Sequence, residues 1–500
     1  MATVSSPSPH AAGVLGRRGA AALYLLLGFS AGLPFYMFST VLSVRLSEHG
    51  AALAVIGFFA WVQLLPTFKF AWAPLVDRFA VPGFARFWGR RVSWIMLAQL
   101  GILSSLLAMA ATADDASLPV TALFAVLLAF WTTTLEVAAD AWRIELAPTP
   151  ELQGPLTAAN LWGYRSAMVA AGSGALLVAD RGGWTAAYLL IAAGAFAPLP
   201  ILAALPPLGR GGDRMAALAK GLGASAAVLV VVAVVAAQIG YLLLSAATWL
   251  GIDARTNVTP WVLGLAMLPF MVMAAALPAI RRAAPDSRLR ASPVWGPYAD
   301  FFWRYGAFAI LLMAFVSIYR MGDVLALNLS KPMILGLGYS KTEIGWADGV
   351  VALAASMVGV GLGGWMVTRW RAGVTLGLGA LFAALGNLAF VWLAAEPPGR
   401  TALYLATAAD QFGNGLAGTV FVVYLSMLVN PRFAGAQYAF LSGFAFLLPR
   451  LIAGAGGSVV SRLDGAGYAG FDLFFLASGA LSLAAILFLP LIARARPRKP

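Results

Sequence analysis

The chain consists largely of apolar runs about 20 residues long, most of which carry few charges. As an α-helix, such a run spans the roughly 30 Å hydrocarbon core of a bilayer, because each residue adds about 1.5 Å. A transmembrane β-barrel would instead show segments of about ten residues with alternating polarity. The runs therefore predict an all-α polytopic membrane protein.

We expect about 14 transmembrane helices, in groups of six, two and six. The expected spans are 20–46, 52–75, 92–112, 118–144, 155–179 and 184–205, then 219–249 and 259–280, then 304–328, 342–368, 373–395, 401–429, 435–461 and 468–492. The corresponding segments are a cytoplasmic tail (1–19), an N-terminal half (20–208), two additional helices (209–281), a cytoplasmic linker (282–303), a C-terminal half (304–493) and a basic tail (494–500).

Composition and charge agree with a membrane protein. Only 11% of the residues are charged and 61% are hydrophobic, whereas a soluble domain has about 25% charged residues. In a soluble protein the net charge of +13 would suggest a nucleic-acid partner. Here Lys and Arg gather in alternate loops, as they do when they set membrane topology. We therefore expect a monomer in a lipid bilayer with both termini in the cytoplasm, and no nucleic-acid partner.

The chain has no cysteine and only two histidines, His10 and His49. Disulfides, thiolate chemistry, iron–sulfur clusters and histidine-rich metal sites need those residues. We expect no metal and no cofactor.

The two six-helix groups show signs of a repeat. LAVIGFFAWV at 53–62 and KTEIGWADGV at 341–350 share Ile, Gly and Val in register. Glu136 and Asp410 fall in the fourth helix of each group, and Arg165 and Arg450 fall midway along the fifth. Two parallel halves of six helices around a midplane site form the major facilitator arrangement, which is the fold we expect.

Charged residues are concentrated between Trp131 and Arg165. Glu136, Asp140 and Arg143 are spaced to share one helix face. A charge at the bilayer centre costs about 3 kcal/mol, so each needs a partner or a polar cavity. One interpretation is a water-accessible transport cavity in which a carboxylate takes up and releases a proton, with Glu136 as the first choice. The alternative is a purely structural network of ion pairs.

The second half offers a comparable set of polar residues, in which Arg320 and Asp323 are spaced i,i+3 for an ion pair. Arginine forks suit carboxylates, and aromatic rings suit sugars, although lipid or core packing is the commoner role of an aromatic side chain. The proton-coupling candidates are Glu136, Asp140, Asp323 and Asp410. The substrate-binding candidates are Arg165, Arg450, Tyr164, Gln437, Asn414, Arg320, Tyr36 and Trp142.

Two connecting segments are also informative. Asp77, Arg78, Arg90 and Arg91, in the loop between the second and third helices, resemble the loop signature of major facilitators and are the expected gate; the alternative is that the arginines only set topology. Lys69 either extends to the interface or meets the substrate. The aromatic stretch PYADFFWRYG, at the end of the linker, predicts an interfacial amphipathic helix or an ordinary connector.

Motifs along nearly the whole chain resemble the AmpG-type muropeptide permeases, a branch of the major facilitator superfamily that also contains acetyl-CoA transporters. They are LGFSAGLPF, FKFAWAPLVDR with GRR, DAWRIEL, NLWGYR, YRMGD and AQYAFLSGF followed by Arg450. The resemblance implies proton-driven import of N-acetylglucosaminyl-1,6-anhydro-N-acetylmuramic acid and its peptides across the inner membrane, for cell-wall recycling. By motif position it implies roles for Glu136, Asp140, Tyr164, Arg165, Asp323, Gln437 and Arg450.

The chain departs from the pattern of that family in two places. Leu135-Glu136 replaces a Gln-Asp pair, and Asp348-Gly349 replaces an Asn-Lys pair, while Lys331 is added nearby. The local charge shift leaves acetyl-CoA or another large anionic solute as an alternative cargo. A membrane-embedded enzyme is a remote alternative, since no span contains His or Cys and no long loop offers room for a catalytic domain.

Overall fold

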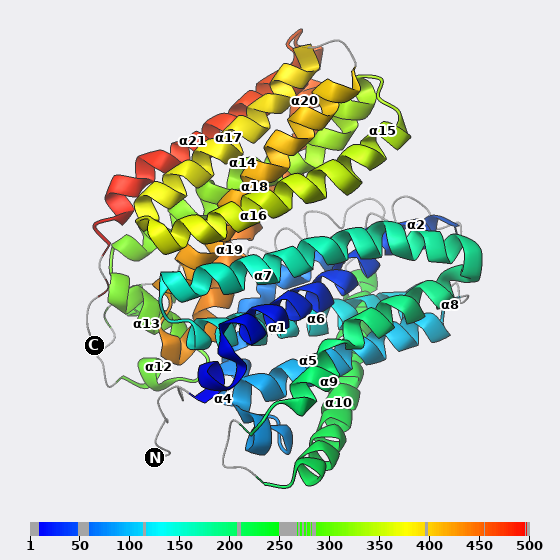
Figure 1. Ribbon diagram of the computed structural model, residues 1–500, viewed down its shortest axis with the longest axis vertical. Helices are drawn as coiled ribbons and strands as arrows, with labels where there is room; N and C mark the ends of the chain where they lie inside the picture. Colours follow the sequence, from blue (N-terminus) through cyan, green and yellow to red (C-terminus); the bar gives the residue numbers. More distant parts are fainter. Residues whose placement is uncertain are drawn as a thin grey trace. The chain divides into compact units, whose positions relative to one another are not determined.

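A computed structural model of the chain describes residues 10–48, 60–113, 117–207, 212–249, 287–395, 399–454 and 456–495, with isolated residues at 268, 271–272, 275–276, 278–280, 282 and 497. All its regular elements within these ranges are helices (Figure 1). The chain forms two compact units. Unit 1 comprises 1–146, 166–297 and 431–436, and unit 2 comprises 147–165, 298–430 and 437–500.

Unit 1 contains the helices of the first half and the first additional helix. They are α1 (His10–Met37), α2 (Thr40–Glu48), the 3₁₀ helix η1 (Ala60–Ala71), α4 (Ala73–Arg78), α5 (Phe84–Ala111), α6 (Leu118–Leu146), the π-helix η2 (Ala170–Gly174), α8 (Ala175–Phe196), α9 (Pro198–Ala204), α10 (Arg214–Trp249), α12 (Arg288–Ala291) and the 3₁₀ turn η4 (Pro431–Phe433). The helix α7 (Pro150–Val169) belongs to unit 2 as far as Arg165.

Unit 2 contains the helices of the second half. They are α13 (Gly296–Tyr305), α14 (Phe308–Gly336), α15 (Lys341–Trp346), the π-helix η3 (Ala347–Val351), α16 (Ala352–Arg369), α17 (Ala372–Ala395), α18 (Arg400–Leu428), α19 (Ala434–Gly454), α20 (Gly456–Gly465) and α21 (Gly470–Ile492). The first residues of α19, up to Ala436, belong to unit 1.

The predicted all-α membrane class is confirmed. The described residues contain eleven helices long and apolar enough to cross a membrane, so the expected number is not matched directly. Two predicted spans, 155–179 and 184–205, lie in one run from Pro150 to Ala204 that bends at Gly183 (φ 78°). Two others, 52–75 and 259–280, extend over residues outside the described ranges.

The predicted span 435–461 falls on α19 (Ala434–Gly454) and α20 (Gly456–Gly465), and Ala455, between them, lies outside the described residues.

Small residues set the helix spacing in unit 2. A Cβ on Gly359 would meet the Phe412 carbonyl, and one on Gly413 would meet the Phe382 carbonyl. Consequently α18 packs directly against α16 and α17, as the parallel ribbons in Figure 1 show. Close backbone approach through glycine is the usual way in which helices associate in membranes.

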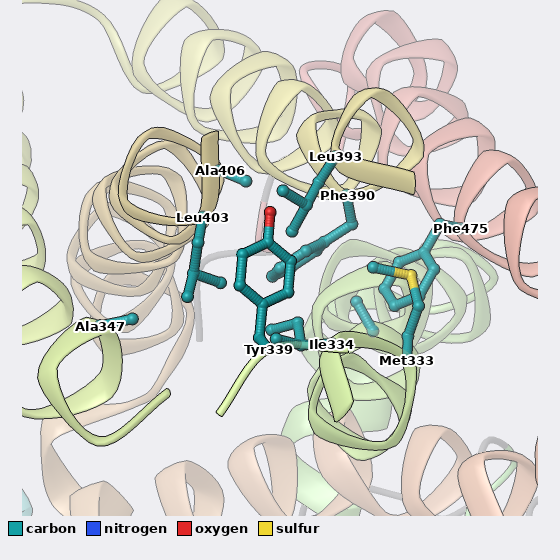
Figure 2. Close-up of a cluster of buried hydrophobic side chains, with 10 residues drawn as sticks. Met333, Ile334, Tyr339, Ala347, Phe390, Leu393, Leu403, Ala406 and Phe475 are labelled. Atoms are coloured by element: carbon teal, nitrogen blue, oxygen red, sulfur yellow. The ribbon is translucent and has the colours of Figure 1, made fainter. Parts of the chain in front are cut away.

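The end of unit 2 has an apolar core around Tyr339 (Figure 2). Side chains from α14, α17, α18 and α21 surround its ring, and Phe390, Leu393 and Leu403 are among them. The Tyr339 hydroxyl donates to the Gly399 carbonyl and accepts from the Gly399 amide. This core fixes the ends of the helices that hold the polar residues described below.

The first additional helix, α10, packs against α5, where a Cβ on Gly221 would collide with the Phe84 ring. Most of its other side chains are exposed, as expected for a helix facing lipid. The aromatic linker stretch does form a helix, α13, but its rings do not face outward as an interfacial anchor requires. Tyr298, Phe301 and Phe302 are buried and contact Phe440 of α19.

Candidate functional site

Lys69 and Glu136 form an ion pair inside unit 1. The Lys69 ammonium lies 3.5 Å from Glu136 Oε2, and the two side chains are 9% and 25% exposed. Lys69 is therefore turned toward α6. Beside this pair, Trp72 donates its indole N–H to the Thr134 hydroxyl. A lysine, a carboxylate and polar donors meet here at the middle of α6.

Asp140 and Arg143 form the i,i+3 pair that their spacing predicts, at 2.8 Å. The Arg143 side chain is only 1% exposed, whereas that of Asp140 is 20% exposed. Trp142 is buried, with its ring 5.9 Å from that of Tyr24. Tyr36 is half-buried, and its ring lies against the backbone of η2 at Gly172.

Residues of α4 and α5, on either side of the loop that joins them, form a second charged cluster with the end of α6. Arg91 pairs with Asp77 at 2.7 Å and with Glu145, at the end of α6, at 2.6 Å. Asp77 also accepts hydrogen bonds from the backbone amides of Gly435 (3.1 Å) and Ala436 (2.7 Å), at the start of α19. Unsatisfied amides at a helix N-terminus favour such an anion.

The other loop arginines differ from Arg91. Arg90 approaches Glu145 only at 3.9 Å. Arg78 is exposed and lies over the Phe79 ring, so it is outside this cluster. A positive φ of 79° at Gly89 directs the two following arginines, and a side chain at this position would be strained.

A network of polar side chains connects α7, α14 and α18 in unit 2. Arg165 donates to Gln411 Oε1 (3.1 Å) and to Asn414 Oδ1 (3.2 Å). Arg320 donates to the same Asn414 oxygen at 3.4 Å and pairs with Asp323 at 2.8 Å, as the sequence spacing predicts. Gln411 in turn donates to Asp410 at 2.8 Å. Every one of these residues lies near the middle of a membrane-length helix.

Arg450 adds a further guanidinium next to this network. Its Cζ lies 5.5 Å from the centroid of the Phe446 ring, and the Cζ of Arg320 lies 5.5 Å from the same centroid. Two arginines from different helices therefore share one aromatic ring, each at a cation–π distance.

Gln437, one of the predicted substrate-binding residues, lies where α19 meets α13. It is fully buried, and its side-chain NH2 donates to Asp300. Its side-chain oxygen accepts from Arg304 and from the backbone N–H of Asn430. These bonds fasten α19 to α13. Tyr164, next to Arg165, is half-buried.

The structure thus divides the predicted residues among three clusters. Glu136 and Asp140 lie in unit 1, and Asp77 and Arg91 form the loop cluster there. Arg165, Asn414, Arg320, Asp323, Asp410 and Arg450 lie in unit 2. Sequence reasoning missed Glu145, Gln411 and Phe446. Glu145 had a signal, because it ends a helix on the side expected to carry the basic loops, whereas nothing distinguished Phe446 from other aromatic residues.

Curated proteins similar to this chain cover almost its whole length. A Rickettsia conorii protein named AmpG 4 is 27% identical over 471 residues, which are 93% of this chain and 94% of that protein. The anhydromuropeptide permease of Escherichia coli K12 is 25% identical over 470 residues, 93% of this chain and 79% of that one. No family model matches the chain. The resemblance to AmpG-type permeases found in the motifs is confirmed.

Solved structures show the fold. The proton:xylose symporter XylE, a major facilitator bound to 6-bromo-6-deoxy-D-glucose, aligns over 96% of this chain and 95% of its own, with a TM-score of 0.59 and 16% identity. A double-tryptophan XylE mutant gives a TM-score of 0.60 at 14% identity over 96% of each chain. The chain is a multi-pass membrane protein with the major facilitator fold, as predicted.

Proposed function

We propose that the protein is a proton-coupled secondary transporter that imports anhydro-muropeptides from the periplasm to the cytoplasm. The observation that carries this proposal is the arginine–amide network in unit 2, together with the AmpG-named relatives. A guanidinium at mid-membrane costs about 3 kcal/mol on insertion scales, so several of them together favour a functional role. Muropeptides bring carboxylates for arginine, and hydroxyl and amide groups for the neighbouring amides.

Proton coupling is assigned to carboxylates within the helices. Glu136 is our first choice because its partner is a lysine 3.5 Å away. Protonation of Glu136 would cancel this ion pair and leave Lys69 to find another partner, which links proton uptake to movement of η1 against α6. One charge crossing 100 mV yields about 2.3 kcal/mol, somewhat under two decades of accumulation per proton. Asp140, Asp323 and Asp410 are the other candidates.

The gate is assigned to the cluster of Asp77, Arg91 and Glu145. Asp77 accepts two backbone N–H bonds from the start of α19 while it holds Arg91. Opening this end of the pathway would break those bonds together, so the cluster would keep the pathway closed while they are intact. In this proposal the cluster is on the cytoplasmic side of the bacterial inner membrane, both termini are cytoplasmic, and the monomer is the working unit.

Uptake into membrane vesicles tests the function directly. Vesicles containing the protein should accumulate labelled anhydro-disaccharide when the outside is acidic, and a proton ionophore should abolish that accumulation. Accumulation that survives the ionophore would contradict coupling. If the protein instead takes up acetyl-CoA and not the disaccharide, the cargo assignment is wrong.

The arginines provide a test of the site. We expect Arg165→Ala and Arg450→Ala each to reduce uptake to the background of empty vesicles, because each removes a donor fork from the unit 2 network. The amount of protein in the membrane should stay near the wild-type level, measured by quantitative immunoblotting. Loss of both variants from the membrane would favour the structural ion-pair network.

A further inference from the structure

We propose that Arg320 and Arg450, with Phe446 and Asn414, form a carboxylate subsite that receives the anionic end of the cargo. The anionic group is the free carboxylate of the lactyl arm or of the attached peptide. This inference rests on the proposed function and adds the residues that the anionic end of the cargo contacts. All four residues belong to unit 2, on α14, α18 and α19.

One edge of the Arg320 guanidinium is poorly satisfied by its neighbours. Its Nη1 is used by Asp323 at 2.8 Å. Its Nε is buried and has no hydrogen-bond partner, and its Nη2 reaches the Asn414 oxygen only at 3.4 Å. Nε and Nη2 form one side of the guanidinium fork, the side that binds a carboxylate through two parallel bonds. The Arg320 side chain is only about 10% exposed, so a lost hydrogen bond there is costly.

Asn414 lies between two guanidinium groups. Its Oδ1 accepts bonds from both Arg165 and Arg320, at 3.2 and 3.4 Å. Charge-assisted bonds between a guanidinium and a carboxylate are about 2.7–2.9 Å long, so these are long bonds to a neutral oxygen. Asn414 therefore occupies the place of an anion without supplying its charge. One turn further along α18, Gly418 has no side chain, and a Cβ there would be 4.0 Å from Arg320 Nη1.

The ring of Phe446 contacts the guanidinium groups of both Arg320 and Arg450. Arg320 and Arg450 lie at equal distances, 5.5 Å, from the centroid of Phe446. The ring attracts each guanidinium, but the two like charges repel each other. A carboxylate bound to both would remove that repulsion and would meet the unsatisfied Nε. A ring at this position also gives an apolar surface to the lactyl methyl group or to a peptide side chain.

The test compares two ligands that differ in one charge. The full-length protein in lipid nanodiscs is titrated with anhydro-disaccharide carrying a free lactyl carboxylate, and with the same compound as its methylamide. We expect the wild type to bind the acid at least tenfold more tightly. Asn414→Asp places a built-in carboxylate between the arginines, so it should lose this preference and still bind the methylamide with near-wild-type affinity. Retained binding of the methylamide also shows that the variant is folded.

Two further variants make the result specific. Thr401→Glu adds the same charge to the same helix at an exposed position outside the network, and the acid preference should remain. Phe446→Leu removes the shared ring and should reduce the preference at least threefold. Three results would overturn the subsite and leave the proposed function standing: equal binding of acid and methylamide by the wild type, an Asn414→Asp variant that still prefers the acid, or equal loss of the preference in Thr401→Glu. If the wild type binds neither ligand, the proposed function fails as well.

Discussion

Individual charged residues within the helices are satisfied in two different ways. In unit 1, Glu136 and Asp140 each meet a cation, while in unit 2, Arg165 meets neutral amide oxygens. Protonation of such a carboxylate breaks its ion pair and leaves the basic partner without its counter-charge, which would couple proton uptake to a change of contacts. An arginine held by amides keeps its charge and is suited to an anion.

This difference predicts the behaviour of Glu136→Gln. The variant cannot take up a proton at this position, so import should become independent of the pH gradient while exchange of cargo down its concentration gradient continues. We expect accumulation in an imposed pH gradient to fall at least tenfold, with counterflow within about threefold of wild type. Asp180→Asn, at an exposed position of α8, leaves the Lys69–Glu136 pair in place and serves as the control. Wild-type accumulation by Glu136→Gln would assign coupling to another carboxylate.

At the residue scale the sequence predicted local pairs and missed distant ones. The i,i+3 spacing was sufficient for Asp140–Arg143 and Arg320–Asp323, because three residues along a helix bring two side chains onto one face. Lys69 and Glu136 are 67 positions apart, and their pairing depends on how η1 packs against α6. A sequence pattern carries no such information.

Among the helices, α13 holds the start of α19 in position through hydrogen bonds. A single oxygen of Asp300 accepts bonds from Arg304 (3.0 Å), Asn430 (3.2 Å) and Gln437 (2.9 Å). Arg304 and Tyr305 also donate to the Leu428 carbonyl at the end of α18. The short linker helix therefore ties together the end of α18 and the start of α19.

We predict that Asp300→Ala destabilises the protein substantially. The change leaves three donors, of which Gln437 is fully buried, without their shared acceptor, and hydrogen bonds to a charged group contribute about 1.5–3 kcal/mol each. Thermal unfolding in detergent should show a loss of about 3 kcal/mol or more. Asp213→Ala, at an exposed position before α10, should cost about 1 kcal/mol or less. Equal melting of the two variants would contradict the fastening role.

The start of α19 also provides a test of the gate. In Asp77→Asn the side chain keeps one acceptor oxygen but loses its charge toward Arg91 and toward the two amides of Gly435 and Ala436. We expect uptake to fall about tenfold, equivalent to about 1.4 kcal/mol, with little change in cargo binding. Arg78→Gln is the matched control, because Arg78 is exposed next to the cluster. Similar uptake by both variants would mean that these loop charges only set topology.

Helix boundaries were predicted best where one apolar run ended in a charged or proline-containing loop, as for α17 and α18. The prediction was less successful where packing decides. The aromatic rings of α13 have the composition of an interfacial anchor, but Phe440 offers them a buried surface.

At the scale of the whole molecule, the Asp77 bonds constrain the number of membrane crossings. Asp77 follows the second predicted span, and Ala436 lies in the first turn of α19. The Ala436 backbone nitrogen is nevertheless only 2.7 Å from Asp77 Oδ2. Both must be on the same side of the membrane, which requires an even number of crossings between them. The run from Pro150 to Ala204 is 55 residues long, about 80 Å as a helix, so it must cross twice. The described helices from α5 to α18 then give an odd number of crossings.

One more crossing is needed, and the predicted span 259–280, most of which lies outside the described residues, is the segment that can supply it. With it, we predict that both termini are cytoplasmic, on the side to which the basic loops are assigned. Because the chain has no cysteine, single cysteines report this without background. A membrane-impermeant maleimide should leave Ser5→Cys and Pro500→Cys unlabelled in intact spheroplasts and label both after permeabilisation. Ala116→Cys, in the acidic loop on the opposite side, should react in intact spheroplasts. Labelling of Pro500→Cys alone among the two termini would mean an odd total and would contradict the predicted topology.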